Sequence, residues 1–196
     1  MTTEVWDEVA LIGIQGEDDS AEVQWAARTE DITGLELGEK AIEGRPTLSG
    51  GRIVKKTQQA DGTLTLKMFP VGVDSKTSGV SGYLAGTAGS SDPYTVLNTH
   101  SWKKNRIILL WASTLPATAG AAVGAGVEAY RLTVINAYCT NVTIDYTDKH
   151  KTAEVTFTWT PFNKDGDSNV SEEYSAAGGT GIGAAAATAN DKNGQW

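Results

Sequence analysis

Hydrophobic and polar residues alternate most regularly between positions 130 and 146 of the chain. Apolar or aromatic residues recur there at every second position for most of the run: Tyr130, Leu132, Val134, Tyr138, Val142, Ile144 and Tyr146. A period of two with many aromatic and β-branched side chains predicts a β-strand with one buried face. Because the run exceeds the usual strand of about five or six residues, we expect a bend or bulge near Ala137–Asn141.

The same period continues at Ala153–Thr160, where Val155, Phe157 and Trp159 alternate with polar residues. The polar stretch Thr147–Thr152 between the two runs is typical of a turn. We therefore expect these residues to form a long antiparallel hairpin with one apolar face.

A second hairpin is predicted from Gly51–Gln58 and Thr63–Phe69. The pair Asp61-Gly62 lies between them, and Asp-Gly favours the positive φ angles of a tight hairpin turn. Apolar residues alternate with polar ones in the second run, whereas the first run is rich in basic and polar residues. We therefore expect the outer end of the first strand to leave the core.

Three more strands are predicted at Val9–Ile14, Ala21–Ala27 and Arg106–Ala112. The last is apolar almost without interruption, which is typical of a strand covered on both faces. One short helix is predicted over Asp74–Leu84. The expected fold is mainly β: an antiparallel β-sandwich or barrel with long hairpins and one short helix.

The chain divides into two predicted parts. Residues 1–174 are expected to form one β domain, and residues 175–196 an Ala- and Gly-rich C-terminal arm with too few apolar residues for a core of its own. The run Gly178–Gly183 is similar to a phosphate-binding loop, but no predicted strand precedes it. We interpret it as a flexible linker, and the Ala- and Gly-rich stretch Ala117–Gly126 as a surface loop.

Composition argues against several classes of protein. The chain has 196 residues, with 16 Lys and Arg against 24 Asp and Glu, and a net charge of -8. This balance argues against a protein that grips nucleic acid, because such binding depends on cationic side chains that displace counterions. No apolar run reaches the roughly 20 residues needed to cross a bilayer. The acidic N-terminus lacks the basic start of a secretory signal, so we expect a soluble protein made in the cytoplasm.

Catalytic and metal-binding residues are scarce in the sequence. Cys139 is the only cysteine, and His100 and His150 are the only histidines, so neither a thiolate zinc site nor a multi-histidine centre is expected. Cys139 is interpreted as a small buried hydrophobe. Asp165 and Asp167 are similar to the start of a calcium loop, but its Gly and Glu are missing, which favours a turn. We expect no enzyme and no cofactor.

Five of the six tryptophans fall into two groups. Trp111 and Trp159 lie inside predicted strands and are expected in the core. Trp6, Trp102 and Trp196 lie near chain ends or in loops. A large aromatic side chain in such a place typically anchors a partner, which here would be a neighbouring copy of the chain.

Two segments carry recognisable features in a fixed order. Ile42–Val73 has a paired Gly50-Gly51 that opens a strand, an Asp-Gly pair and a closing Phe-Pro-Val. Tyr130–Asn169 has an Asn-Ala-Tyr bend, a long hairpin and the ending Thr-Pro-Phe-Asn-Lys-Asp-Gly. In their order and spacing these features resemble the tail tube (major tail) proteins of tailed viruses.

The resemblance implies a structural virion protein whose β-barrel strands join with those of neighbouring copies into hexameric rings. Such rings stack into a hollow tail tube for genome delivery, with a loop or hairpin and the terminal arms reaching the adjacent ring. The implied partners are other copies of the chain, tape-measure, tail-terminator and tail-tip proteins, and a sheath where the tail has one. Double-stranded DNA would pass without specific binding, and the implied location is the virion tail.

This resemblance gives the polar residues a role. The polar faces of the two hairpins become the candidate wall of the lumen: Thr63, Thr65, Lys67, Glu154, Thr156 and Thr158. A mostly neutral or anionic wall would not hold DNA, because few phosphates would be neutralised. The candidate contacts within or between rings are Arg52, Lys55, Lys56, Asp61, Trp6, Trp102 and Trp196. We expect Lys55 and Lys56 to pair with carboxylates such as Glu17, Asp18 or Asp19 at a ring–ring contact.

Two alternatives stay open at this point. The chain could be the inner-tube protein of a contractile injection system, which shares the fold. It could also be a monomeric β-sandwich that binds carbohydrate or protein through exposed tryptophans. Light scattering separates these classes, since a binding module stays monomeric whereas a tube subunit forms rings or polymers.

Overall fold

The computed structural model describes residues 9–16, 22–28, 32–68, 104–146 and 151–185. These residues form ten strands with antiparallel pairing throughout. The strands are β1 (Val9–Gly16), β2 (Val23–Arg28), β3 (Ile32–Glu36), β4 (Ile42–Pro46), β5 (Arg52–Lys56), β6 (Gly62–Met68), β7 (Lys104–Ala112), β8 (Ala129–Tyr146), β9 (Lys151–Trp159) and β10 (Val170–Ser175). The mainly β prediction is confirmed. The helix predicted at Asp74–Leu84 lies outside the described residues.

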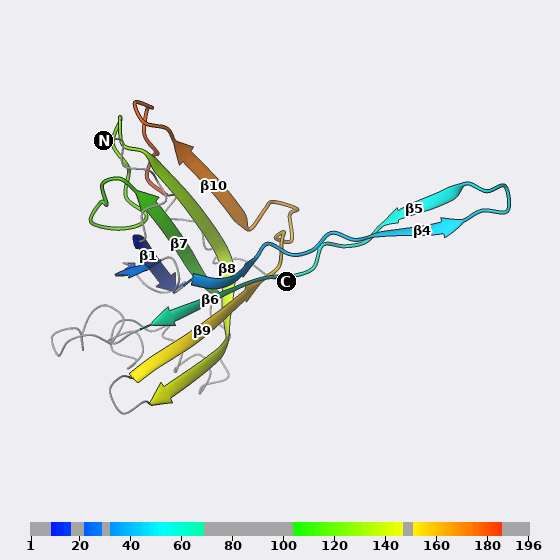
Figure 1. Ribbon diagram of the computed structural model, residues 1–196, viewed down its shortest axis with the longest axis horizontal. Coiled ribbons are helices and arrows are strands. Elements are labelled where there is room, and N and C mark those ends of the chain that lie inside the picture. Colours follow the sequence, from blue (N-terminus) through cyan, green and yellow to red (C-terminus); the bar gives the residue numbers. More distant parts are fainter. Residues whose placement is uncertain (1–8, 17–21, 29–31, 69–103, 147–150, 186–196) are drawn as a thin grey trace.

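Eight strands form one sheet in the order β2-β1-β7-β8-β9-β6-β3, with β10 also paired to β8, while β4 and β5 pair only with each other (Figure 1). The first half of β8 pairs with β7 and β10, and its second half pairs with β9. Its register shifts between Cys139 and Asn141 against β9, which confirms the predicted irregularity. A second shift lies opposite Asn105 and Ile107, where Asn136 has a φ of 55°. The long β8 therefore joins the two halves of the sheet.

The sheet curls so that its two halves share one core. Side chains from β1 and β6, which are far apart in the strand order, belong to the same buried cluster. This inner core consists of Ala10, Ile12, Ile14, Leu64, Leu66, Ile107, Leu109, Trp111, Leu132, Val134, Ala137, Cys139, Val155, Phe157 and Trp159. The core positions predicted for Trp111, Trp159 and Cys139 are thereby confirmed.

Strand β7 is buried on both faces, as its uninterrupted apolar sequence predicts. Ile107 and Leu109 point into the inner core, whereas Ile108 and Leu110 point to the opposite face. A second buried cluster, the outer core, covers that opposite face: Leu11, Ile108, Leu110, Ala119, Val123, Ala129 and Ile182. Three of its members come from outside the sheet, so loops complete this layer.

Two segments that we interpreted as loose are packed in the outer core. The stretch Ala117–Gly126 contributes buried Ala119 and Val123, and Val123 exchanges two backbone hydrogen bonds with Ile182 of the glycine-rich run. The interpretation of Gly178–Gly183 as a flexible linker is therefore wrong. Sequence reasoning missed it because a single buried isoleucine among glycines carries no periodic signal.

A buried guanidinium fastens both segments to the sheet. Arg131 of β8 is completely buried and donates hydrogen bonds to Ala121 O at 3.1 Å and Gly183 O at 2.6 Å. It also forms an ion pair with Glu173 of β10 at 2.6 Å. One side chain thus joins β8, β10, the loop after β7 and the segment after β10.

The second predicted hairpin is wrong in its pairing. Residues Gly51–Gln58 do not pair with Thr63–Phe69: β5 pairs with β4, and β6 pairs with β9 and β3. Gly62 is not at a turn, and its φ is not positive. Its backbone packs directly against the indole of Trp159, and a Cβ added to Gly62 would lie 2.6 Å from Nε1 of that indole. Glycine is needed at position 62 because the β6 backbone passes close to the Trp159 side chain of β9. A local sequence pattern does not reveal a contact between two distant parts of the chain.

Candidate assembly surface

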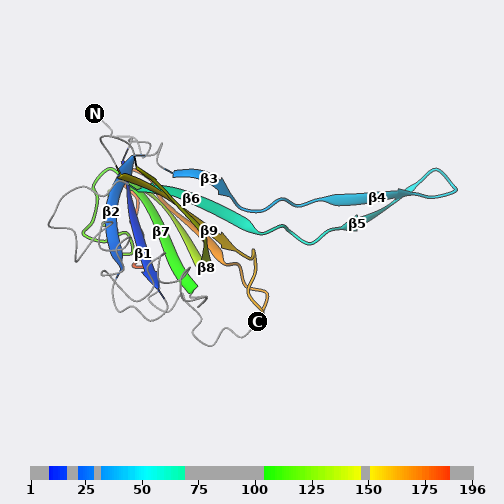
Figure 2. The same cartoon turned by 90° about the horizontal axis from the view of Figure 1, so that it is seen from below.

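A long hairpin projects away from the rest of the molecule (Figures 1 and 2). We define the arm as residues 37–61, which contain β4, β5 and the two-stranded stem below them. Every residue of β4 and β5 is exposed. The expectation that the strand after Gly51 leaves the core is therefore confirmed, although its partner is β4.

Local hydrogen bonds hold the arm in its extended form. At the tip, Thr47 N donates to Gly51 O at 2.8 Å and Gly50 N donates to Thr47 O at 3.1 Å, with Gly50 at a φ of 81°. In the stem, Thr57 N donates to Ala41 O at 3.0 Å. The Gln59 side chain adds a bond from Nε2 to Leu37 O at 2.7 Å. These bonds fix the backbone, but none of them buries apolar surface.

The arm carries much of the exposed apolar surface of the described residues. Its large exposed side chains, with their exposed fractions, are Leu37 (41%), Ile42 (69%), Leu48 (111%), Ile53 (66%) and Val54 (58%). A lone two-stranded hairpin is marginally stable in water, and clustered exposed apolar side chains mark interaction sites. The arm therefore exposes apolar side chains along its length, in the manner of an interaction site.

The outer part of the arm is basic, although the chain as a whole is acidic. Between residues 42 and 56 there are four basic residues and one acidic residue, in a chain with an overall excess of acid. Arg52 lies opposite Pro46, and Lys56 lies opposite Ile42, on one face of the hairpin. Lys55 lies opposite Glu43 on the other face. Because neighbouring strand residues point to opposite faces, Lys55 and Lys56 cannot face one partner side by side.

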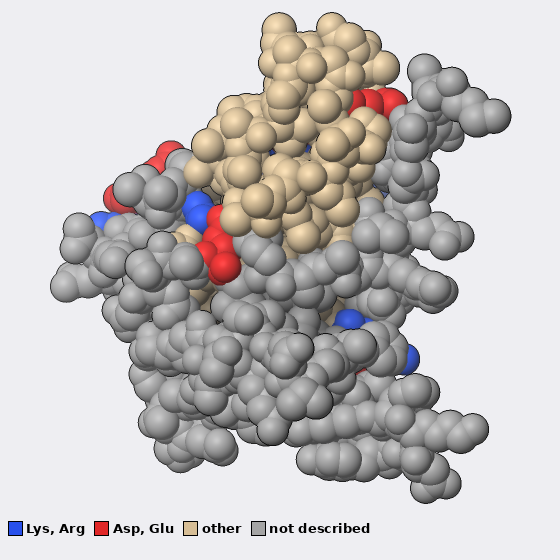
Figure 3. Space-filling view, turned by 90° about the vertical axis from the view of Figure 1, so that its left-hand side faces the viewer, with Lys and Arg blue, Asp and Glu red and all other residues tan. Residues whose placement is uncertain are grey.

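The face of the molecule turned away from the arm carries few charged side chains among its described residues. Figure 3 shows that the described part of this face is largely uncharged, with Lys, Arg, Asp and Glu at its margins. The basic residues Arg45, Arg52, Lys55 and Lys56 belong to the arm instead. Among the described residues, four exposed basic side chains thus lie on the part of the chain that projects furthest.

A groove lies where the arm meets the sheet. It has a volume of about 340 Å³, and its lining residues come from the stem, from the loop after β9 and from β10: Leu37, Lys40, Gln59, Pro161, Phe162, Ser168, Val170 and Glu172. Phe162 is 50% exposed there. Asp61, which we predicted in a contact between copies, is exposed at the root of the arm and directly precedes β6.

The loop beside the groove is shaped by its own polar side chains. Asn163 Oδ1 accepts hydrogen bonds from the backbone N–H groups of Asp165 (2.9 Å) and Asp167 (2.8 Å). The buried Asn169 donates from Nδ2 to Thr160 O at 2.8 Å and accepts from Asn136 at 2.8 Å. The predicted turn is confirmed.

The six residues predicted for the lumen wall lie on one face of the sheet. On β6 and β9 they stand directly opposite one another in three pairs: Thr63 with Thr158, Thr65 with Thr156, and Lys67 with Glu154. The hydroxyls of Thr65 and Thr156 are 3.0 Å apart. Thr140 of β8 extends the row, with its hydroxyl 3.0 Å from that of Thr158. We call this surface the threonine face.

Two titratable groups of the described residues have shifted pKa values. Burial, and to a smaller extent the carboxylate of Glu172, raise the pKa of Tyr130 above its ordinary value of 10.0. Burial also lowers the pKa of Arg106 below its ordinary value, against the opposing effect of Glu22, its ion-pair partner at 2.6 Å. Tyr130 packs against the inner core beside Trp111, and neither group lies in the arm.

The described residues show neither a metal-ligating cluster nor a membrane-spanning helix. Among the described residues, no group of three or more His, Cys, Asp or Glu side chains could hold a metal ion. The same residues include no helix with the length and apolar character needed to span a membrane. Trp6, Trp102, Trp196 and the acidic residues 17–19 lie outside the described ranges.

No protein-family model matches the chain. No curated protein matches it by sequence. Similarity is found with solved structures. A chain of the cryo-EM structure of the anti-feeding prophage (AFP) baseplate, 6-fold symmetrised, aligns with a TM-score of 0.54 at 11% identity, over 88% of this chain and 97% of that one.

Two other solved structures align less well. A chain of the PVC sheath-tube complex, an extracellular contractile injection system in its extended state, gives a TM-score of 0.47 at 14% identity, over 83% of this chain and 88% of that one. A chain of the anti-feeding prophage tube-terminating cap gives 0.45 at 14% identity, over 84% and 88%. Of the three, the AFP baseplate chain alone exceeds 0.5, and at 11% identity it shows a shared fold.

Proposed function

We propose that the chain is a structural subunit that assembles with copies of itself into a tail tube, as stacked hexameric rings around an open channel. The observation that carries the proposal is the arm, an ordered hairpin with all of β4 and β5 exposed and with large apolar side chains along it. Such an element gains stability from a partner and offers nothing to an isolated monomer. The shared fold with a chain of a six-fold symmetrised baseplate supports this role.

Open sheet edges support self-assembly as well. Among the described strands, β2, β3 and β10 each pair with one neighbour only. Unpaired edges invite further strands, and pairing between identical copies is one way to protect them. A head-to-tail contact that closes gives a ring, and the faces of a ring can then stack without limit.

The threonine face is proposed as the wall of the channel. Its hydroxyl groups are uncharged, and its one basic residue, Lys67, stands opposite Glu154. A wall of this kind neutralises few phosphates, so double-stranded DNA would pass through without being held. In this role the chain would be a component of a virion tail, and tape-measure, terminator, tip and sheath proteins would be its further partners.

The inner tube of a contractile injection system is a second candidate, favoured by the fold shared with the AFP baseplate chain. The two functions use the same rings and differ in what the channel carries. Neighbouring genes separate them: a capsid gene and a tape-measure gene indicate a virus, whereas a cluster without a capsid gene indicates an injection device.

Sedimentation velocity and negative-stain microscopy of the purified chain test the proposal. We expect rings or tubes for the wild type, and monomers for the double variant Ile53→Asn and Val54→Asn, whose melting temperature should be unchanged because both side chains are exposed. The matched control is Leu115→Asn, which replaces an exposed apolar residue outside the arm and should assemble normally. A wild-type chain that stays monomeric at every concentration contradicts the proposal.

A further inference from the structure

The groove at the root of the arm is a second exposed apolar feature of the molecule. Leu37 (41% exposed) and Phe162 (50% exposed) line it together with Val170. Its volume of about 340 Å³ is large enough for one or two aliphatic side chains. It also lies along β10, a strand that pairs only with β8 among the described strands. The groove is thus a partly apolar hollow beside an open sheet edge, and its polar lining residues are Lys40, Gln59, Ser168 and Glu172.

Acidic residues outnumber basic ones around the groove, although Lys40 of the stem is also among its lining residues. The segment from 161 to 175 holds one basic and four acidic residues. Glu173 is paired with the buried Arg131, and Asp165 lies 3.9 Å from Lys164. Asp167 and Glu172 remain as exposed acids, and Glu172 lines the groove itself. The groove therefore suits an apolar side chain flanked by a basic one.

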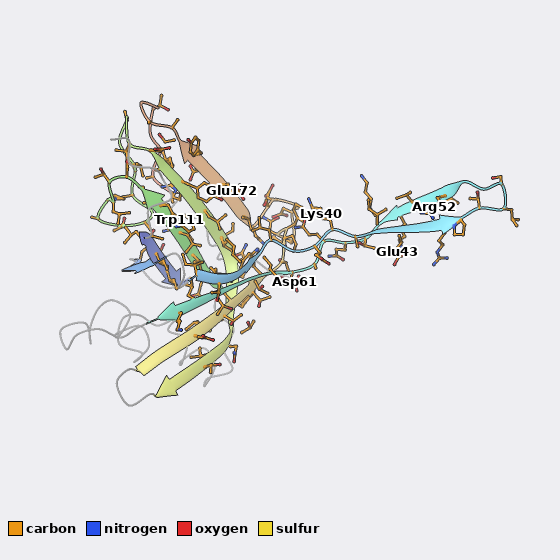
Figure 4. The ribbon with its side chains drawn as sticks, viewed as in Figure 1. Lys40, Glu43, Arg52, Asp61, Trp111 and Glu172 are labelled. Atoms are coloured by element: carbon orange, nitrogen blue, oxygen red, sulfur yellow. The ribbon has the colours of Figure 1, made fainter. Side chains whose placement is uncertain are left out.

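The tip of the arm has this combination. Leu48 is fully exposed at the turn, and Arg52 follows the turn on the face that also bears Pro46 and Val54. The tip cannot reach the groove of its own chain, because Arg52 lies near the far end of the arm while Lys40 and Glu172 lie near its root (Figure 4). A tip that fills such a groove must come from another copy.

We propose that the arm tip of one copy docks in the root groove of the next copy, with Leu48 in the apolar hollow and Arg52 against Glu172. This inference rests on the proposed self-assembly and adds the contact that drives it. The contact is head-to-tail, since tip and groove are different surfaces, and each copy that receives a tip also offers one.

The contact fixes a distance between copies. Leu37, at the groove, and Leu48, at the tip, are eleven residues apart. At about 3.3 Å per residue of extended chain, the tip lies about 36 Å from the groove. Because the tip of one copy occupies the groove of the next, the grooves of the two copies are separated by roughly this length. That spacing holds whatever rotation relates the two copies.

Charge reversal tests the pairing. Arg52→Glu and Glu172→Arg should each raise the concentration needed for half-maximal assembly about tenfold, through repulsion or loss of attraction. The double variant should return it to near the wild-type value. The control combines Glu172→Arg with Arg45→Glu, which lies on the other face of the arm and should give no rescue. Equal behaviour of the two double variants overturns the pairing.

Thiol cross-linking tests the docking independently. Leu48→Cys combined with Ser168→Cys should give covalent multimers with a short bismaleimide, while each single variant gives none, since Cys139 is buried. The control pair, Leu48→Cys with Thr143→Cys, places the second thiol on an exposed site away from the groove. Assemblies that form without a cross-link at residue 168 overturn the docking site and leave the proposed function standing. A wild-type chain that never assembles overturns both.

Discussion

Replacing Gly62 by alanine directs a methyl group at the indole of Trp159. The new Cβ would be 2.6 Å from both Cζ2 and Nε1, whereas ordinary contacts of a Cβ begin at about 3.4 Å. Gly62 and Trp159 stand opposite each other on β6 and β9, and both are buried. The methyl group therefore has no space unless the strand or the indole moves by close to 1 Å.

The size of the effect follows from two opposing contributions. Overpacking of a tight core site costs about 1–3 kcal/mol. Alanine restricts the unfolded chain more than glycine, which returns about 0.4–1 kcal/mol. We expect a net loss of about 1.5 kcal/mol in the free energy of unfolding, or about 3–6 °C in Tm for a chain of this size. Chemical denaturation under conditions that keep the chain monomeric measures the loss.

A double-mutant cycle identifies the cause. Trp159→Phe removes the ring atoms that meet the new methyl group, so Gly62→Ala should cost less than about 0.5 kcal/mol in the Trp159→Phe background. Gly62→Asn is the control for turn geometry, because asparagine tolerates a positive φ but fits no better against Trp159. If alanine costs the same with either residue at 159, or if asparagine is tolerated, the close-approach explanation is wrong.

The remaining predictions concern the arm and the packing of the outer core. Reversing Lys55 and Lys56 to Glu should abolish assembly, seen by sedimentation, while leaving the monomer's Tm unchanged; unchanged tubes would remove both lysines from the contact. Glu173→Gln should lower the free energy of unfolding by about 2–3 kcal/mol. This is less than for a fully buried ion pair, because the Glu173 side chain is 42% exposed. An effect below about 0.5 kcal/mol would show that the two carbonyl groups alone are enough to hold the buried Arg131 guanidinium. The raised pKa of Tyr130 means that its contribution to stability is full below pH 10 and is lost as pH rises through the folded-state pKa. Tyr130→Phe should therefore weaken the alkaline fall in stability, and a fall of the same steepness in both proteins would contradict this.

Strands with a strong alternating pattern could be predicted from the sequence. The hairpin of β8 and β9 was predicted because apolar and polar residues alternate along both strands, and β7 because its residues are apolar on both faces. The threonine face follows from the same alternation, since the residues that alternate with Leu64 and Phe157 along their strands point to the other face of the sheet and are polar where that face meets solvent. These features depend on local period alone.

The strands of the arm and the packing of the C-terminal segment could not be predicted from a local alternating pattern. β3, β4 and β10 were not predicted, because they are short and their side chains are largely exposed, which leaves no apolar period. Asp61-Gly62 gave the wrong hairpin, since the contact with Trp159 that requires glycine joins distant parts of the chain. Ile182 was missed for the same reason. The proposed assembly residues on the arm were placed by resemblance, and the groove proposed to receive the arm tip could only be located in three dimensions.

The most direct test of self-assembly around a channel is electron cryomicroscopy of the full chain at high concentration. We expect a hollow tube of six-membered rings in which the threonine face lines the channel and successive copies touch through the arm. A solitary particle without a pore, or a tube whose channel is lined by another face of the sheet, would contradict it.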